Sequence, residues 1–308
     1  MLPRHPGFGV RLALALAGLW GGLSGLPACG GEALDPASAT GTARVESLMS
    51  AGVRRTFTVY SPAASPPATG WPVLIAFHGA GGDGPGMRAL MGVEGAADRD
   101  GILVVYPDAA PDTRGTWALG CFQCTWADAQ GVDDYRFARD LVDTLAARHG
   151  VDRRRVYVAG FSLGGSFAND LTCRAGDLVA GAAVVASLPS ADELPGCGPT
   201  RAHTIAIMVG DQDPNIPWTG GGTYQYLGAE EDARRWSAWD GCSGAPAGTL
   251  LPDRDGDGRR VAVTTYAPCG DGTSVRLYRV TGGGHAWPNG DLDASGELFT
   301  LFFGSGTA

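Results

Sequence analysis

The chain has 308 residues, of which 44% are hydrophobic, so it can bury a large core, and its length fits a single α/β domain. Its formal net charge is −9, from 23 Lys and Arg against 32 Asp and Glu. Basic residues gather only near the start of the chain and at residues 153–155, which excludes nucleic acid as an expected partner.

Residues 1–28 have the pattern of an export signal. A short basic region precedes the apolar run of residues 12–20, which is too short and too interrupted by glycine to be a stable membrane span. The segment ends in Leu-Pro-Ala-Cys at residues 26–29, which resembles a bacterial lipobox, where the signal is cut before a cysteine that receives a lipid. Cys29 is therefore the expected lipid anchor. Plain secretion is the alternative, because Pro27 is unusual in such a motif.

Residues 29–43 are small and polar and predict a flexible tether, and residues 44–308 form the expected folded domain. In that domain strand and helix patterns alternate, which predicts a mostly parallel, doubly wound α/β sheet without repeats. Strands are predicted at residues 53–60 (an antiparallel edge), 73–77, 102–106, 155–159, 178–187, 205–209 and 275–280. Helices are predicted at residues 133–149, from residue 164 onward, and at residues 229–240.

The stretch Gly160-Phe161-Ser162-Leu163-Gly164 lies between a predicted strand and a predicted helix. Gly-x-Ser-x-Gly in this position is the pattern of a nucleophile elbow, a tight and strained turn that lifts the serine hydroxyl above the sheet edge. A chain with 49 glycines contains such patterns by chance, so the strand–turn–helix context supports the assignment. Ser162 is the predicted nucleophile, and an incidental glycine-rich turn is the alternative.

A serine nucleophile needs a histidine that takes its proton and a carboxylate that orients the histidine. On such an elbow fold the partners follow in the order Ser, Asp or Glu, His, on loops after later strands. Of the five histidines only His203 and His285 follow the serine, and His203 precedes a strand. His285 comes soon after the strand at residues 275–280 and is the predicted base; a turn or surface histidine is the alternative.

Two aspartates compete for the role of the acid after the strand at residues 205–209. Asp211 stands at the strand end, where an aspartate commonly caps a turn. Asp213 precedes Pro214, which favours an extended exit and lets the carboxylate reach the top of the sheet. Asp213 is the predicted acid, with Asp211 as the alternative.

A tetrahedral intermediate also needs backbone N–H donors. Leu163, directly after the serine, and Ala80, in the glycine-rich loop at residues 78–82, are the predicted donors. A phosphate-binding turn is the alternative for this loop. It is disfavoured because neither Lys-Ser/Thr nor a G-x-G-x-x-G pattern accompanies the loop.

The segments FHGAGG, VDDYRFARDLVDTL, RVYVAGFSLGG, GDQDPNIPW, WDGC and VRLYRVTGGGHAWPNG together resemble a family of secreted esterases. That family groups polyhydroxybutyrate depolymerases with feruloyl and acetylxylan esterases, and the resemblance covers residues 54–303. It implies an α/β-hydrolase fold, serine esterase activity without a cofactor, and a triad of Ser162, Asp213 and His285. The extra acid Asp211 departs from the usual acid loop of the family.

The cysteines support export. There are seven, and setting Cys29 aside leaves an even set of six, which suits disulfides outside the cytosol. The expected pairs are Cys242–Cys269, which bracket a hairpin-like segment, Cys121–Cys124 and Cys173–Cys197. The single C-x-x-C lacks the further ligands of a zinc site, and a redox role is disfavoured in an exported protein.

Residues 253–258 match the front of a calcium loop, D-x-D-x-D-G. Thr264 stands where the bidentate acid of a full loop belongs, and no helices are predicted beside it. We therefore expect no metal and a solvated Asp-Gly hairpin, with calcium at Asp253, Asp255 and Asp257 as the alternative.

Three tryptophans near the predicted site, Trp117, Trp218 and Trp287, could stack on a planar acid or a sugar face, and burial in the core is the alternative. We expect an extracellular, outer-membrane or periplasmic monomer that contacts a membrane only through a lipid anchor. Its expected substrates are feruloyl or acetyl esters of plant cell-wall polysaccharide. The first alternative is a short polyester substrate such as oligomeric hydroxybutyrate. Solid polyester is less expected, because the chain has no room for a surface-binding domain after residue 303. The second alternative is a catalytically silent binding protein on the same scaffold.

Overall fold

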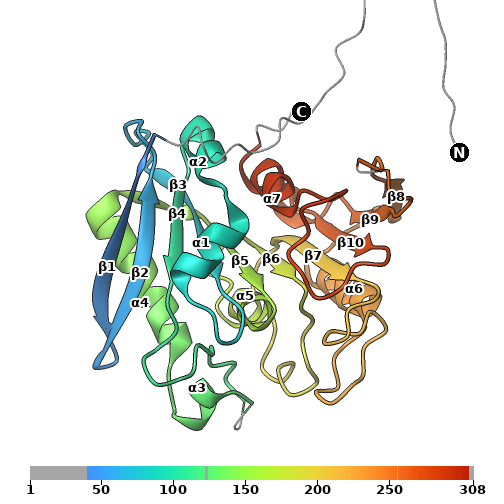
Figure 1. Ribbon diagram of the computed structural model, residues 1–308, viewed down its shortest axis with the longest axis horizontal. Helices are drawn as coiled ribbons and strands as arrows, with labels where there is room; N and C mark the ends of the chain where they lie inside the picture. Colours follow the sequence, from blue (N-terminus) through green and yellow to red (C-terminus); the bar gives the residue numbers. More distant parts are fainter. Residues whose placement is uncertain (1–39, 122–123, 255, 305–308) are drawn as a thin grey trace, which may run out of the picture. The chain divides into compact units, whose positions relative to one another are not determined.

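The computed structural model describes residues 40–121, 124–254 and 256–304 (Figure 1). Ten strands form one sheet in the order β1-β2-β4-β3-β5-β6-β7-β10-β9-β8. The strands are β1 (Thr42–Ser50), β2 (Val53–Ser61), β3 (Trp71–Phe77), β4 (Leu103–Pro107), β5 (Val151–Phe161), β6 (Gly181–Val185), β7 (Thr204–Gly210), β8 (Ala247–Leu250), β9 (Val261–Tyr266) and β10 (Val275–Val280). The helices are α1 (Gly84–Met91), α2 (Glu94–Asp100), α3 (Trp126–Ala129), α4 (Asp134–His149), α5 (Leu163–Arg174), α6 (Ala229–Trp239) and α7 (Ala294–Phe303), with a 3-10 turn at Gly270–Gly272.

The middle of the sheet is parallel and both margins are antiparallel. Strands β4, β3, β5, β6, β7 and β10 pair in parallel, while β1 and β2 border one side and β9 and β8 the other. Every residue of β3 is buried, as in a strand covered on both faces. Because the carboxyl ends of parallel strands meet at one edge, the loops after β3, β5, β7 and β10 come together there.

Helices cover both faces of this sheet (Figure 1). Alternate residues of β3 show the division: Val73 and Ile75 belong to the core layer with α4, α5 and α6, while Leu74 and Ala76 belong to the layer with α1, α2 and α7. This arrangement confirms the expected doubly wound, mostly parallel sheet.

The N-terminal margin differs from the sequence prediction. Residues 53–60 were expected to be an edge strand, but β1 pairs along the whole of β2 and forms the edge instead. Strand β1 begins at Thr42, so the last two residues of the expected tether, 42 and 43, are part of the sheet. Ala51 and Gly52 both have positive φ (47° and 82°), as a two-residue hairpin turn requires.

The structure links Cys121 to Cys124, Cys173 to Cys197, and Cys242 to Cys269, which are the three pairs expected from the sequence. The antiparallel hairpin β8–β9 lies between the last two cysteines. Residues 1–28 and Cys29, the predicted signal and lipid anchor, lie outside the described residues. Within the described part, no helix is both long and apolar enough to cross a membrane.

Candidate active site

The elbow around Ser162 is built from backbone packed against backbone. A Cβ atom on Gly160 would lie 1.9 Å from the carbonyl oxygen of Gly164, and a Cβ on Gly164 would lie 2.3 Å from that of Phe77. No side chain fits at either glycine. Ser162 itself has φ 53° and ψ −123°, a sparsely populated conformation for a residue with a side chain. Its N–H donates to the Val185 carbonyl oxygen at 2.9 Å, which fixes the turn to the end of β6.

Three side chains from three loops form one hydrogen-bonded chain. The Nε2 atom of His285 lies 2.9 Å from Ser162 Oγ, and its Nδ1 lies 2.8 Å from Asp213 Oδ2. The other carboxylate oxygen of Asp213 accepts the N–H groups of Asn215 at 2.8 Å and Ile216 at 3.0 Å. The acid is buried and fixed by three donors, so it can hold the imidazole in one orientation.

Asp211, the alternative acid, contacts other groups. Its Oδ1 accepts the Gly282 N–H at 2.7 Å, and its Oδ2 accepts Nε of Arg279 at 3.0 Å. These bonds hold the turn that leads from β10 to His285. Asp211 therefore supports the loop of the histidine, while Asp213 contacts the histidine itself.

The two expected amide donors border the same cavity as Ser162. Ala80 and Leu163 both line this pocket. Leu163 is the first residue of α5, where backbone N–H groups have no acceptor within the helix. The helix N-terminus also carries partial positive charge, which favours a developing oxyanion there.

The loop that contains Ala80 is held by the buried His78. His78 Nδ1 lies 2.8 Å from the Gly79 carbonyl oxygen, and its Nε2 accepts the Ala109 N–H at 3.2 Å. Burial lowers the pKa of His78, which favours the neutral ring that these two bonds require. The Gly81 N–H adds a bond to the Gly115 carbonyl oxygen at 3.0 Å.

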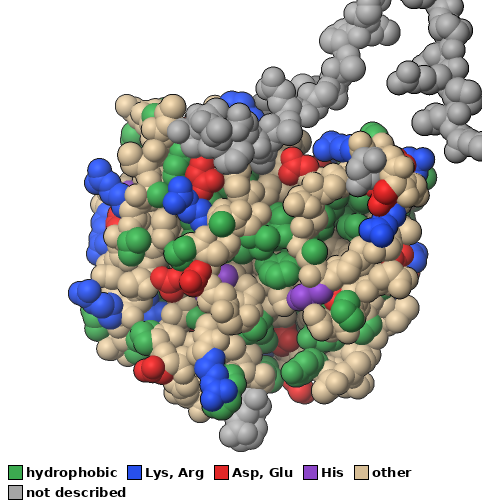
Figure 2. Space-filling view, viewed as in Figure 1, with side chains coloured by type: hydrophobic (Ala, Val, Ile, Leu, Met, Phe, Trp, Pro, Cys, Tyr) green, Lys and Arg blue, Asp and Glu red, His purple; other side chains and the backbone are tan. Residues whose placement is uncertain are grey.

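The cavity at Ser162 has a volume of about 820 Å³. Trp126 and Tyr224, which are 49% and 62% exposed, stand in its wall together with Tyr226 and Ile216. Figure 2 shows that hydrophobic side chains gather over the middle of the visible face, with basic side chains mainly around them. The pocket thus offers aromatic surface to a planar group.

Two of the three expected substrate tryptophans are buried, so the prediction that they stack on substrate is wrong and the alternative, core burial, holds. Trp117 is fully buried, stacks on Phe167 with ring centroids 5.5 Å apart, and donates its indole N–H to the His78 carbonyl oxygen at 2.9 Å. Trp287 is 5% exposed and donates to Ser295 Oγ at 3.1 Å. These indoles brace the loops instead of contacting solvent.

Trp218 is half-buried, and the guanidinium of Arg279 lies 5.2 Å from its ring centroid. The aromatic residues that do line the pocket, Trp126, Tyr224 and Tyr226, were missed. They lie beside a disulfide and in a glycine-rich loop, where sequence periodicity gives no signal.

The acidic loop between β8 and β9 forms turns. Oδ1 of Asp253 accepts the Gly256 N–H at 2.7 Å, and its Oδ2 accepts the Gly258 N–H at 3.2 Å, as aspartates often do in turns. Ligand atoms of Asp253, Asp257 and Asp291 lie within 4.8 Å of one another. Asp255, the third residue of the calcium alternative, lies outside the described residues.

The family model described as "Putative esterase" matches residues 49–251. Feruloyl esterase B of Piromyces equi is 30% identical over 233 residues, which cover 72% of this chain and 40% of that protein. The protein named "Putative esterase NocK" of Nocardia uniformis subsp. tsuyamanensis is 31% identical over 269 residues, which cover 82% of this chain and 76% of that protein. The match to the Piromyces protein thus spans less than half of its length.

Among solved structures, the acetyl xylan esterase from Aspergillus awamori superposes with a TM-score of 0.60. The match covers 85% of this chain and 100% of that chain at 17% identity. At this identity the likeness shows the fold alone, and it confirms the expected α/β-hydrolase fold.

Proposed function

Because this chain belongs to the esterase family, we propose that it is an exported serine hydrolase of carboxylic esters, and that it acts on feruloyl or acetyl esters of plant polysaccharide. The observation that supports this most is the hydrogen-bonded chain from Ser162 through His285 to Asp213 at the edge of the pocket. Acyl transfer needs a nucleophile, a base and an orienting acid in hydrogen-bond contact. Here the two contacts, from His285 to Ser162 and to Asp213, are 2.9 and 2.8 Å long.

In the proposed reaction Ser162 Oγ attacks the ester carbonyl carbon while His285 Nε2 takes the hydroxyl proton. Asp213 stabilises the imidazolium that forms. The tetrahedral oxyanion accepts the N–H groups of Ala80 and Leu163. The imidazolium then protonates the departing alcohol and leaves an acyl-serine. His285 deprotonates a water, which attacks the carbonyl carbon of that ester. The imidazolium returns this proton to Ser162 Oγ as the acyl–oxygen bond breaks, and the carboxylic acid is released.

The substrate class rests on two supports. The relative from Piromyces is named as a feruloyl esterase, and the structural neighbour from Aspergillus as an acetyl xylan esterase. The exposed rings of Trp126 and Tyr224 in the pocket wall also suit a planar acyl group. Oligomeric hydroxybutyrate lacks such a planar group and stays the alternative substrate.

Three disulfides support export, since such bonds persist in oxidising compartments. Acylation of Cys29 would then hold the enzyme at a membrane surface. That residue lies outside the described part of the chain.

An activity panel tests the function. We expect kcat/KM on methyl ferulate to exceed that on a hydroxybutyrate trimer by about tenfold or more. Hydrolysis should be lost in Ser162→Ala and kept in His149→Ala, whose imidazole contacts Glu46 on the surface. The reverse ratio would make the protein an oligoester hydrolase. A wild-type protein that cleaves none of these esters, nor p-nitrophenyl acetate, would be a silent binding protein.

A further inference from the structure

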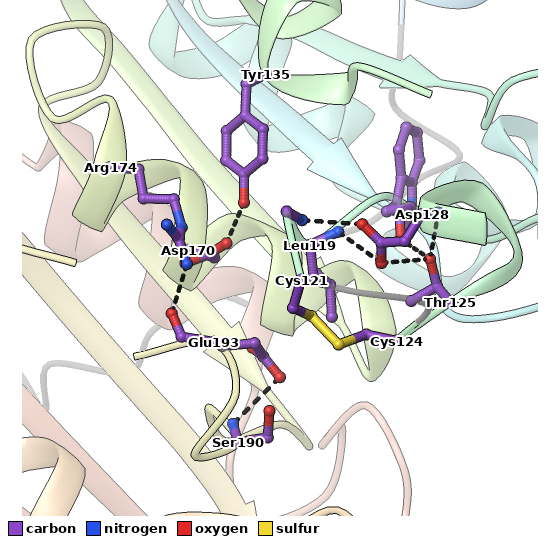
Figure 3. The surroundings of a disulfide bond; sticks show 12 residues. Leu119, Cys121, Cys124, Thr125, Asp128, Tyr135, Asp170, Arg174, Ser190 and Glu193 are labelled. Carbon is purple, nitrogen blue, oxygen red and sulfur yellow. Dashed lines mark hydrogen bonds and ion pairs between the residues drawn. A yellow bond between two sulfur atoms is a disulfide. The ribbon is translucent and has the colours of Figure 1, made fainter. Parts of the chain in front are cut away.

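A buried acid that the proposed reaction does not use stands in the pocket wall. Glu193 follows β6, is 4% exposed, and lines the same cavity as Ser162. Its Oε1 accepts the Ser190 N–H at 3.1 Å (Figure 3). Within the described part of the chain, no hydrogen-bond donor contacts its buried Oε2. Most buried polar atoms have a partner, so an exception in the wall of the pocket that Ser162 lines points to a ligand.

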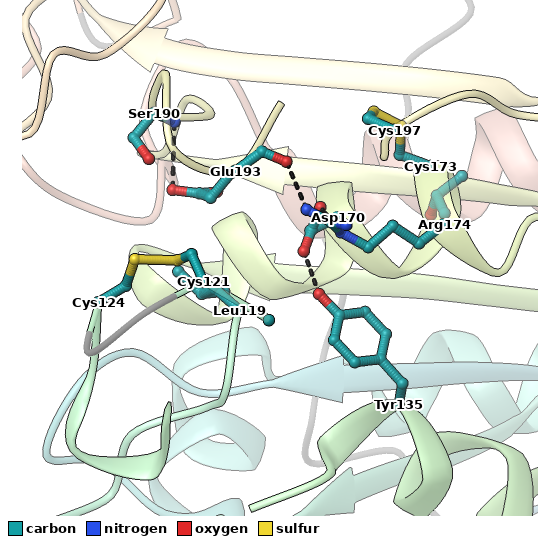
Figure 4. Close-up of polar contacts among 12 residues, drawn as sticks. Leu119, Cys121, Cys124, Tyr135, Asp170, Cys173, Arg174, Ser190, Glu193 and Cys197 are labelled. Carbon is teal, nitrogen blue, oxygen red and sulfur yellow. Dashed lines mark hydrogen bonds and ion pairs between the residues drawn. A yellow bond between two sulfur atoms is a disulfide. The ribbon is translucent and has the colours of Figure 1, made fainter. Parts of the chain in front are cut away.

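Arg174, which contacts the backbone of Glu193, has its guanidinium engaged by other acceptors. Arg174 Nε donates to Asp170 Oδ1 at 2.8 Å, and its Nη2 donates to the backbone carbonyl oxygen of Glu193 at 2.7 Å (Figure 4). The hydroxyl of Tyr135 donates to the other oxygen of Asp170. The carboxyl group of Glu193 therefore receives no charged donor from this cluster.

Burial raises the pKa of Glu193 to about 7, and the negative charges of Asp170 and Asp232 act in the same direction. The hydroxyl and the backbone N–H of Ser190 both lower this pKa by hydrogen bonding to the carboxyl group. The group is thus an incompletely bonded carboxyl that changes charge near neutral pH. A ligand that donates a hydrogen bond to it would stabilise the ionised form.

The carboxyl group of Glu193 is buried in the wall of the pocket. In Figures 3 and 4 the Cys121–Cys124 disulfide lies across from Glu193 and Ser190. Cys124, Ser190 and Glu193 all line the pocket, which also includes the ring of Tyr226. A neutral hydroxyl is desolvated in such a place at far lower cost than an ammonium group, so a hydroxyl is the donor that fits.

We propose that Glu193 is a specificity-determining residue whose carboxyl group accepts a hydrogen bond from a hydroxyl on the acyl ring of the substrate. It favours esters of hydroxylated aromatic acids over those whose ring hydroxyl is methylated. The inference rests on the proposed function, because it assumes that the acyl group occupies this pocket while Ser162 attacks. It adds a polar contact to the aromatic wall formed by Trp126 and Tyr224.

The test compares methyl 4-hydroxycinnamate with methyl 4-methoxycinnamate at pH 8, where Glu193 is mainly ionised and only accepts hydrogen bonds. For the wild type we expect kcat/KM to be about tenfold higher on the hydroxy ester, the size expected for a hydrogen bond to a charged group. Glu193→Gln keeps an oxygen for the Ser190 N–H but places an NH₂ donor at the second position. Because either ring oxygen can accept from this NH₂, the two esters should then react within about twofold of each other.

Glu231→Gln is the matched control, since it makes the same change at an exposed acid that is not among the residues lining the pocket, and it should leave the ratio unchanged. A ratio that persists in Glu193→Gln, or a wild type that shows no preference, would overturn the proposal. A binding measurement distinguishes failure of the proposed function from failure of the proposed Glu193 contact. Both esters are titrated into Ser162→Ala and into the double variant Ser162→Ala with Glu193→Gln. A Glu193-dependent preference in binding without hydrolysis by the wild type would refute the proposed function and support the site. No such preference in binding, together with normal hydrolysis, would refute the site alone.

Discussion

The backbones of Gly160 and Gly164 pack directly against each other at the elbow. A Cβ atom on Gly160 would lie only 1.9 Å from the carbonyl oxygen of Gly164. This approach brings the end of β5 against the start of α5 and leaves Ser162 as the residue that turns the chain. The positive φ of 53° at Ser162 is the conformational cost of that turn. Gly160 and Gly164 are thus required because no side chain fits between the two backbones.

Gly160→Ala should therefore be severe. The new methyl group meets backbone, which cannot move aside like a side chain, so we expect the free energy of unfolding to fall by about 3 kcal/mol or more. Ester hydrolysis should be lost as the elbow distorts. Urea denaturation and a p-nitrophenyl acetate assay measure the two effects. Gly198→Ala is the control, since a Cβ atom there would have no heavy atom of the described chain within 4 Å, and a similar loss in that variant would contradict the steric explanation.

The centre of the fold and the hydrogen-bonded contact of Ser162, His285 and Asp213 were predictable from sequence because local pattern and chemistry agree there. Strand β10 was predicted with its observed bounds, since the strand-like residues Val275–Val280 are soon followed by a glycine-rich turn. His285 could be chosen by elimination among five histidines. The acid needed more than elimination, and the conformational effect of Pro214 separated Asp213 from Asp211.

The features that the sequence did not predict depend on how distant segments pack in the fold. Strand β1 was missed because its first four residues are exposed and lack apolar alternation. Trp117 follows a central strand and Trp287 lies two residues after His285, but both are buried in the core, which their sequence positions cannot reveal. Glu193 gave no signal, because only its burial beside the pocket makes the carboxyl group unusual.

The two competing aspartates should separate clearly in kinetics. Asp213→Ala removes the acceptor of His285 Nδ1 and should lower kcat by about 10⁴-fold, as loss of the orienting acid does in other triads. Asp211→Ala removes only two bonds to the loop before His285, so kcat should fall by at most about tenfold. Steady-state assays of both variants decide the question. If Asp211→Ala were the inactive one, the assignment of the acid would be wrong.

Expression in a bacterial host tests the proposed anchor. Mass spectrometry of the mature protein should find Cys29 acylated and at the N-terminus, because the lipobox-like stretch before it directs cleavage there. Cys29→Ser should release an active protein into the soluble fraction. An unmodified chain that begins at another residue would leave secretion without an anchor.

The disulfide around the β8–β9 hairpin should contribute more stability than the short one beside the pocket. Cys242 and Cys269 are separated by 27 residues, for which loop-closure entropy gives about 3.5 kcal/mol. Cys121 and Cys124 are separated by 3, for which the same relation gives about 1.6 kcal/mol. Denaturation of the two double Cys→Ala variants compares them. Activity should also fall in the first variant, because Cys269 is followed by β10 and then by the loop of His285. Equal losses of stability would contradict the loop-length argument.

The pH dependence of stability should report on Glu193. Burial raises its pKa from 4.5 to about 7, with Asp170 and Asp232 adding to the rise, while Arg174 reaches only its backbone carbonyl oxygen. Between these two values the folded protein binds more protons than the unfolded chain. The free energy of unfolding should therefore decrease as pH rises through this window, by at most about 1.4 kcal/mol per pH unit for one group, and this contribution should be lost above about pH 7. Asp232, whose pKa burial raises to about 6, acts in the same direction.

Glu193→Gln isolates the contribution of this one carboxyl group, since the amide does not titrate while the raised pKa of Asp232 remains. The decrease in the free energy of unfolding between pH 4.5 and 7 should be smaller in the variant than in the wild type, as measured by urea denaturation at several pH values. Asp192→Asn should follow the wild-type curve, because it leaves the buried carboxyl groups of Glu193 and Asp232 in place. Identical curves for Glu193→Gln and the wild type would mean that the Glu193 pKa is the same in the folded and unfolded chain. The carboxyl group would then already be fully hydrogen-bonded or hydrated in the free enzyme, and the unpartnered oxygen on which its substrate contact depends would not exist.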